Sequence, residues 1–384
     1  MKIVLSGVET NNKGAELMLY AMLQEIERTF PEAEVYLPLD SVSQGLDYIH
    51  TKANIKLQPF EKYYQLLLKF KVHRVLKKLH FDPIYIKDIY PIKGVDYFID
   101  GSGLKFSDTM SAANKGEAER WRKLLSGYKK NGTKIVFLPQ SFGPFEKNTT
   151  RETMRQLSVY ADLIYSREDT STKYLNDLGF VNMIKVEQEP DFTTLVEGYI
   201  PEKYKYLQGA VCVIPNMQMV KQGAISKEKY IDLIKQICLC VKNSGREVFL
   251  LNHQGEEDEK LALLCKEAIG GNIVFVNGLN ALEIKGVISQ SYIVISSRFH
   301  GVVSSLNSCV PCLATSWSHK YEELFLKYNQ ENCVLPINDI DASINTIRLF
   351  MDEEINSKIR KSLIAPVDTI KSENKIMWHK IWSL

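Results

Sequence analysis

The chain lacks the apolar segments that carry proteins into or across membranes. No stretch of its 384 residues approaches the roughly 18 consecutive apolar residues of a membrane-spanning helix. The segment Met1–Gly7 has too short an apolar run for a signal peptide and leads directly into a polar turn. The formal net charge is only +2, which gives no reason to expect a nucleic-acid partner. We therefore expect a cytoplasmic protein.

The cysteines do not form the pattern of a disulfide framework or of a structural zinc site. Seven cysteines, an odd number, lie mostly in apolar strand or helix patterns, as reduced and buried thiols do. Cys309 and Cys312 have the spacing of a redox or zinc motif, but no second pair completes a zinc site. The pair also follows a helix pattern, so no helix N-terminus activates its first thiol. We expect no metal and no redox cofactor.

Motifs of several common enzyme classes are absent from the sequence. Gly101-Ser-Gly103 lacks the third glycine and the following helix of a dinucleotide-binding fingerprint. There is no Walker A sequence and no nucleophile elbow for Ser-His-Asp catalysis. Asp339 and Asp341 could bind a metal, although a cap for a helix that starts at Ala342 is the simpler interpretation. Function has to be inferred from how the chain is organised.

Strand and helix patterns alternate in two series, which predicts parallel strands joined by crossover helices. The first series has a helix over 13–29 and strands over 2–6, 33–37, 97–101, 134–138 and 163–166. The second has strands over 210–214, 247–251, 273–276, 292–296 and 312–315, with helices over 227–243, 256–269, 281–289 and 302–307. We predict an α/β protein of two doubly wound, Rossmann-like domains that face a cleft.

The region 190–206 interrupts this alternation with prolines, a glycine and several charges, as an interdomain linker does. We place the first domain at 1–203 and the second at 204–365. The remaining segment, 366–384, carries a helical pattern near 370–382 that we expect to return to the first domain.

The stretch 61–81 predicts a basic amphipathic helix. Its lysines and arginines face a single acidic residue, Glu61, and its apolar residues recur at helical spacing. Such a helix can lie on an anionic membrane surface. It can equally pack its apolar stripe on the domain and expose its charges to water.

The most informative segment is 295–306, which predicts a buried strand, a sharp turn at Gly301 and a helix. Arg298 and His300 lie at that turn. In an open α/β sheet, ligands bind beyond the carboxyl ends of the strands, and the amides that begin a helix favour anions. The two side chains therefore suggest a site for a phosphate or a carboxylate. The structural alternative is an arginine that caps a carbonyl and a histidine that fills a gap.

Further polar side chains are expected at the same edge of the two sheets, because each follows a strand pattern. They are Asn11, Asn12, Glu16, Arg167, Asn252, His253, His319 and Lys320, and Gly14 lies with the first three between the first strand and helix. Each has a structural alternative: Asn12 could cap the following helix, and Arg167 could pair with Glu168 or Asp169. If each of these residues had only a local structural role, there would be no reason for all of them to lie at the same edge of the sheets.

Short motifs that occur in order along the chain resemble those of the polysaccharide pyruvyl transferase family. They are Asn12–Glu16, Asp100–Gly103, Pro139–Pro144, Ser166–Ser171, Pro190-Asp191 and Ser297–Gly301, followed by Pro311 and Lys320. The sequence departs from the family at Glu16, where many members carry Asp, and in Gln140–Gly143, where members often have an additional glycine. These departures concern the acceptor side more than the donor side.

The resemblance implies a fold like that of the B-type glycosyltransferases. It also implies transfer of a pyruvyl group from phosphoenolpyruvate to a sugar, with formation of a cyclic ketal and without a cofactor. Clustered cations suit a donor that carries a phosphate and a carboxylate. We therefore assign Arg167 and Arg298 to the phosphate, Lys320 to the carboxylate and His253 to the donor site. His300 is expected to act as general acid.

The acceptor side implied by the resemblance is less defined. Asn12, Glu16, Gly101 and Asp191 are its candidate residues, and Glu16 or Asp191 could act as base. The expected acceptor is a sugar of a cell-surface polysaccharide or of its lipid-linked oligosaccharide precursor, with helix 61–81 at the inner face of the membrane. One alternative is a B-type glycosyltransferase that uses a nucleotide-sugar, and another is a non-catalytic module that binds a membrane-linked sugar.

Overall fold

The computed structural model describes residues 1–38, 41–58, 70, 72, 75, 92–179, 186–315 and 320–384. The predicted basic helix over 61–81 lies outside the described residues, apart from Phe70, Val72 and Val75. The chain forms two compact units. The first comprises Met1–Asn11, Met18–Phe192 and Asn374–Leu384, and the second comprises Asn12–Leu17 and Thr193–Glu373.

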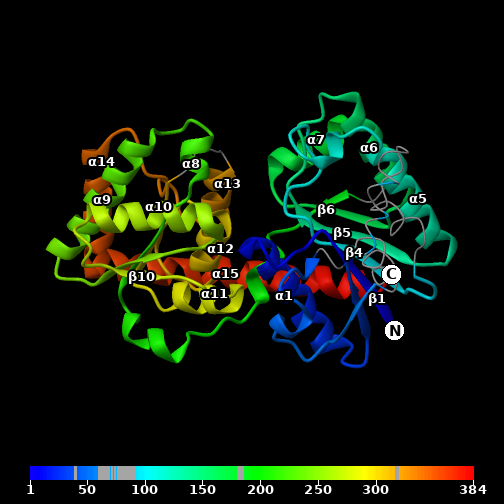
Figure 1. Ribbon diagram of the computed structural model, residues 1–384, viewed down its shortest axis with the longest axis horizontal. Helices are drawn as coiled ribbons and strands as arrows, with labels where there is room; N and C mark the ends of the chain where they lie inside the picture. Colours follow the sequence, from blue (N-terminus) through cyan, green and yellow to red (C-terminus); the bar gives the residue numbers. More distant parts are fainter. Residues whose placement is uncertain are drawn as a thin grey trace. The chain divides into compact units, whose positions relative to one another are not determined.

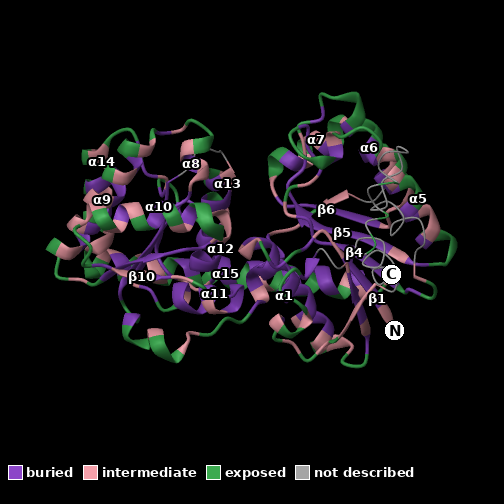
Figure 2. Cartoon of the chain, in the orientation of Figure 1, coloured by how far each residue is buried: buried purple, intermediate pink, exposed green. Residues whose placement is uncertain are grey.

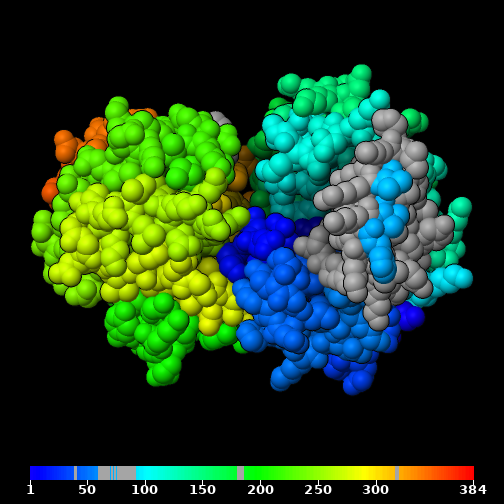
Figure 3. Space-filling view, in the orientation of Figure 1, coloured from blue at the N-terminus to red at the C-terminus, as the bar shows by residue number. Residues whose placement is uncertain are grey.

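The first unit is built on a parallel sheet of seven described strands in the order β3-β2-β1-β4-β5-β6-β7 (Figure 1). The strands are β1 (Lys2–Ser6), β2 (Glu34–Leu37), β3 (Asn54–Leu57), β4 (Tyr97–Asp100), β5 (Lys134–Gln140), β6 (Leu163–Ser166) and β7 (Val186–Gln188). The strand order reverses between β1 and β4, which is where doubly wound sheets place ligands. The edge strand β3 is partly exposed, and residues around it form the blue surface in Figure 3.

Helices cover both faces of this sheet. They are α1 (Lys13–Thr29), α5 (Glu117–Lys130), α6 (Asn148–Tyr160), α7 (Asp169–Asp177) and the end of α15 (Glu353–Trp382). Helices α5 and α6 pack side by side. Trp382 of α15 donates its indole N–H to Glu25 of α1 at 3.0 Å and packs edge-on against Phe30 and Tyr97. Aromatic packing and a satisfied indole N–H thus hold the C-terminal residues on the first unit.

The second unit contains a parallel sheet of five described strands in the order β10-β9-β8-β11-β12. The strands are β8 (Val211–Ile214), β9 (Val248–Leu251), β10 (Val274–Val276), β11 (Ile293–Ser296) and β12 (Cys312–Ala314). Strands β8, β9 and β11 are buried throughout, as expected for parallel strands covered on both faces (Figure 2). The order reverses between β8 and β11, and doubly wound sheets usually bind ligands at the carboxyl ends of the strands at such a reversal.

The helices of the second unit complete a doubly wound layer structure. They are α8 (Gln218–Lys221), α9 (Lys227–Asn243), α10 (Gly255–Ala268), α11 (Ala281–Ser289), α12 (Phe299–Asn307), α13 (Lys320–Lys327), α14 (Ile340–Met351) and most of α15. Helix α9 packs on both α10 and α14, and α11 packs on α12 (Figure 1). The predicted α/β fold with two Rossmann-like sheets is confirmed. No helix among the described residues is both long and apolar enough to cross a membrane.

Two local predictions are wrong. The helix predicted over 302–307 begins at Phe299, so Gly301 lies in the first turn of α12 and not at a sharp turn. A Cβ at Gly301 would lie 2.5 Å from Ser296 Oγ and 3.1 Å from Ile214 Cδ1, so glycine lets the helix approach the sheet closely. The last helix begins at Glu353 instead of near 370, because the internal Pro366 interrupts its sequence pattern.

Candidate functional site

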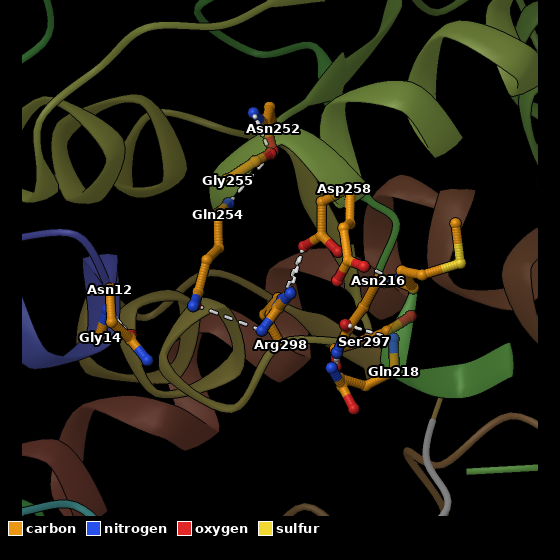
Figure 4. A network of polar contacts seen from close by, with 12 residues as sticks. Asn12, Gly14, Asn216, Gln218, Asn252, Gln254, Gly255, Asp258, Ser297 and Arg298 are labelled. Atoms are coloured by element: carbon orange, nitrogen blue, oxygen red, sulfur yellow. Dashed lines mark hydrogen bonds and ion pairs between the residues drawn. The ribbon is translucent and has the colours of Figure 1, made fainter. Parts of the chain in front are cut away.

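The turn after β11 is clamped to neighbouring segments of the second unit. The amide of Asn216, which follows β8, donates to the carbonyl of Ser297 at 2.8 Å (Figure 4). The hydroxyl of Tyr321 donates to the same carbonyl at 3.0 Å, and the Ser297 and Tyr230 hydroxyls bond to each other. Because these partners are buried, the backbone that carries Arg298 is held at the reversal point of the sheet.

Arg298 extends from this turn into a network of polar contacts (Figure 4). Its Nε and Nη2 donate to Asp258 Oδ2 at 2.8 and 2.5 Å, and its Nη1 donates to Gln254 Oε1 at 3.2 Å. A guanidinium has five N–H bonds, so these three contacts leave two for a ligand. Arg298 is also the residue that precedes α12, and the dipole of a helix favours negative charge at its N-terminus.

His300 lies in the first turn of α12, against the backbone of Gly14. A Cβ at Gly14 would lie 2.4 Å from His300 Nδ1 and 3.0 Å from Cε1. The ring of Phe299 packs edge-on against His300, with ring centroids 5.6 Å apart. The imidazole is therefore confined between a glycine backbone and an aromatic ring, two residues from Arg298.

His253 follows β9 and is almost fully buried. Burial, together with the positive charges of Arg298, His300 and Lys13, holds the pKa of His253 well below its usual value. Its Nδ1 is buried, and no hydrogen-bond partner for it is found among the described residues. The low pKa favours the neutral form of the His253 imidazole.

Two lysines belong to the same unit. Lys320 begins α13, and its Nζ lies 5.3 Å from the centroid of the Phe299 ring. This places Lys320 beside the first turn of α12. Lys13 begins α1, forms an ion pair with Glu16 at 2.6 Å and contributes to the low pKa of His253. His319, by contrast, lies outside the described residues.

Asn12 and Glu16 belong to the second unit, whereas the sequence placed them in a first domain over 1–203. Asn12 caps α1 by accepting the N–H groups of Gly14 and Ala15 at 3.0 and 3.3 Å. The buried Glu16 accepts the N–H of Ala281, the first residue of α11, at 3.2 Å. A carboxylate at a helix N-terminus is favourable, so Glu16 fastens residues 12–17 to the second unit.

Arg167 and Asp191 form a separate buried ion pair in the first unit. Arg167 Nη1 donates to Asp191 at 3.1 Å, Nη2 to Ser141 at 2.9 Å, and Nε to Glu168 at 3.4 Å. Burial raises the pKa of Glu168. The charge of Arg167 and hydrogen bonds from the hydroxyls of Ser141 and Ser171 lower it by more, so the pKa of Glu168 lies below its usual value. The pairing of Arg167 with Glu168 predicted as an alternative is confirmed, and Asp191 is an additional partner.

Gly101 lies at the carboxyl end of β4 and serves close packing. A Cβ there would lie 2.9 Å from Met22 Cε and 3.3 Å from Val8. Beside it, Asp100 accepts from the Ser102 N–H, and Gln140 Nε2 approaches the same carboxylate oxygen at 3.5 Å. Close packing therefore explains why glycine occupies position 101 without any contact to a ligand.

The His, Cys, Asp and Glu side chains of the described residues are the possible ligands of a metal ion, and the cysteines are the possible reactive thiols. No group of three His, Cys, Asp or Glu side chains there is arranged to hold a metal ion. All seven cysteines are free thiols. Burial raises the pKa of both Cys309 and Cys312, which disfavours a reactive thiolate.

A family model described as polysaccharide pyruvyl transferase matches residues 12–319. The chain belongs to this family. The matched range includes the candidate residues of both units except Lys320, which follows its last residue directly. None of the curated proteins compared with the chain is similar to it in sequence.

Solved structures similar to this member of the family share its two-sheet, B-type glycosyltransferase fold. HepE from Anabaena, in complex with UDP and glucose, has 14% identity and a TM-score of 0.59, with 100% of each chain covered. The UDP-forming trehalose-phosphate synthase of Burkholderia xenovorans has 10% identity and a TM-score of 0.54, with 99% and 98% covered. UDP-GlcNAc 2-epimerase from Methanocaldococcus jannaschii has 10% identity and a TM-score of 0.55, with 92% and 94% covered. At such identities the likeness concerns the fold alone.

Sequence reasoning missed three residues that support the site. Asp258 and Gln254 hold Arg298, and Lys13 adds a positive charge. Gly14 was placed at the sheet edge, but its contact with His300 was not predicted. Lys13 lies inside a motif that resembles the family, so it could have been singled out. Asp258 could not, because it is one of three acidic residues in the first turn of α10.

Proposed function

We propose that this family member transfers the enolpyruvyl group of phosphoenolpyruvate to a sugar of a cell-surface polysaccharide or its precursor. The products are a cyclic pyruvate ketal and inorganic phosphate. The observation that carries the proposal is the placement of Arg298 and His300 at the start of α12, at the reversal point of the sheet. Family membership supports the reaction class.

The donor site suits an anion that is recognised by the geometry of its hydrogen bonds as well as by its charge. Arg298 offers two N–H bonds beyond those held by Asp258 and Gln254, and it lies at the N-terminus of α12, where the helix dipole favours an anion. We assign the phosphate to Arg298 and the carboxylate to Lys320. Two N–H bonds of one guanidinium match two oxygens of a phosphate, which is the geometry of strong charge-assisted pairs.

His300 supplies the proton that starts the reaction. Protonation of the methylene carbon creates an oxocarbenium-like centre at the carbon that bears the phosphate. One sugar hydroxyl attacks this carbon, the carbon–oxygen bond to phosphate breaks, and a second hydroxyl closes the ketal. One hydroxyl proton replaces the proton given by His300, and the other leaves with the phosphate.

The first unit contains two of the proposed site residues. Arg167 is proposed as a second phosphate ligand, and Asp191 as a base or acceptor contact. Both candidate bases already accept a hydrogen bond, Glu16 from the Ala281 N–H and Asp191 from Arg167. Arg167→Ala and Asp191→Asn should separate these roles, since the first should weaken donor binding and the second should slow turnover.

The acceptor is proposed to be a lipid-linked sugar, handled at the cytoplasmic face of the membrane. The basic stretch 61–81 supports this proposal through its composition. An assay of phosphate release from phosphoenolpyruvate, with lipid-linked galactose, glucose and mannosamine acceptors, would identify the sugar.

The donor is tested most simply by thermal shift. Phosphoenolpyruvate should raise the melting temperature, because a ligand that binds only the folded state stabilises it. Arg298→Ala should abolish this shift and raise KM for the donor about 10- to 100-fold, as loss of charge-assisted hydrogen bonds does. His300→Ala should lower kcat and leave the shift in place.

A nucleotide-sugar glycosyltransferase is the second candidate. It is favoured by the UDP and glucose bound to the similar structure of HepE. In that case Arg298 would hold a diphosphate. A shift of the melting temperature with UDP, and none with phosphoenolpyruvate, would reject the pyruvyl transfer.

A further inference from the structure

Asp258 links three segments at the reversal point of the second sheet. It lies in the first turn of α10, which follows β9. Its Oδ2 accepts from Arg298, which follows β11, and its Oδ1 accepts from the N–H of Met217, which follows β8, at 2.9 Å. Figure 4 shows the contact between Asp258 and Arg298. The carboxylate is 1% exposed, so water does not compete for these bonds.

This contact fixes both the position and the direction of the Arg298 side chain. A free arginine side chain has about 2 kcal/mol of rotamer entropy, which a ligand must otherwise overcome. With Nε and Nη2 on Asp258 and Nη1 on Gln254, the guanidinium plane is set before any ligand arrives. We propose that Asp258 is the positioning residue that holds Arg298 ready for the phosphate of the donor.

The direction in which loss of the Asp258 charge changes donor binding tests this inference. Asp258 and Arg298 form an ion pair whose formal charges cancel. If Arg298 attracted the donor through net charge alone, removal of the Asp258 charge would strengthen donor binding. If orientation dominates, the same change weakens donor binding, because the two available N–H bonds are no longer aimed together. We expect orientation to dominate, since bidentate pairing with an oxyanion depends on geometry.

The test combines Asp258→Asn with Arg298→Ala. We expect Asp258→Asn to raise KM for phosphoenolpyruvate about tenfold, with a much smaller change in kcat. In the Arg298→Ala background, Asp258→Asn should have no further effect on donor binding, because its effect passes through Arg298. A general loss of structure would instead act in both backgrounds.

Glu256→Gln is the matched control. It removes the same charge from the same turn of α10, but Glu256 is exposed and contacts Lys260 at the helix surface. Its KM should be unchanged. If Asp258→Asn fails to fold, Asp258→Glu keeps the charge, displaces the guanidinium and should still raise KM.

The use of phosphoenolpyruvate as the ligand rests on the proposed function. The possible results nevertheless distinguish a failure of the Asp258 role from a failure of the proposed function. A lower or unchanged KM in Asp258→Asn, with a strong effect of Arg298→Ala, overturns the positioning role and leaves pyruvyl transfer intact. Equal effects of Asp258→Asn with and without Arg298 also overturn it. If Arg298→Ala does not weaken phosphoenolpyruvate binding, the proposed donor site and the inference both fail.

Discussion

The substitution Gly14→Ala tests whether the imidazole of His300 carries the reaction. The added methyl group would lie 2.4 Å from Nδ1, 3.0 Å from Cε1 and 3.2 Å from Cγ of His300. Ordinary contacts begin near 3.4 Å, so the ring has to retreat by about 1 Å, the difference between 3.4 and 2.4 Å. A displacement of about 1 Å at a reacting group can reduce the rate about 100-fold.

The same substitution should spare the fold. Gly14 lies in the first turn of α1 and has no positive φ angle, so alanine fits its backbone. Alanine also favours a helix over glycine by up to about 1 kcal/mol, which offsets part of the crowding. We therefore expect a folded protein that still binds phosphoenolpyruvate but turns over about 100-fold more slowly.

The assay is steady-state phosphate release from phosphoenolpyruvate with an active acceptor, supported by thermal shift for donor binding. The control is Gly14→Ala in a His300→Gln background. There the methyl group should cause little further loss, because the group it displaces no longer transfers a proton. Full activity of Gly14→Ala, or an equal loss with and without His300, would show that His300 is not the group that moves the proton.

Three further outcomes are expected. Glu16→Gln removes one partner of a buried ion pair and an acceptor for the α11 N-terminus, so chemical denaturation should show a loss of about 3 kcal/mol or more; an unchanged midpoint would contradict the anchoring role. The pKa of His253 is lowered in the folded state, so only the unfolded chain gains a proton at this residue as the pH falls below about 6.5. The free energy of unfolding should therefore drop by about 1.4 kcal/mol from about pH 7.5 to about pH 5.5, and this pH-dependent loss should be missing in His253→Asn. If helix 61–81 binds membranes, reversal of four lysines to glutamate should abolish sedimentation with anionic vesicles, and retained sedimentation would exclude this surface. These lysines are Lys69, Lys71, Lys77 and Lys78.

The alternation of apolar strands and amphipathic helices predicted all five described strands of the second sheet and five of the seven described strands of the first. Strands β3 and β7 were not predicted, because these partly exposed edge strands lack a continuous apolar run. Helices α9 and α11 have the bounds that their sequence periodicity predicts. Periodicity is a local property, and parallel strands buried on both faces are nearly uniformly apolar, so they stand out in the sequence. The errors occurred where a local signal has two explanations, as at Gly301, where glycine serves close packing instead of a turn.

The sequence also determined which residues follow the strands, and therefore that Arg298 and His300 lie at the carboxyl end of β11, where folds of this type bind their ligands. It could not determine which partners hold them. The association of residues 12–17 with the second unit, the seat of His300 on Gly14 and the bond from Arg298 to Asp258 join segments far apart in the chain. Such contacts depend on how buried polar groups find partners in three dimensions, and no periodicity along the chain records them.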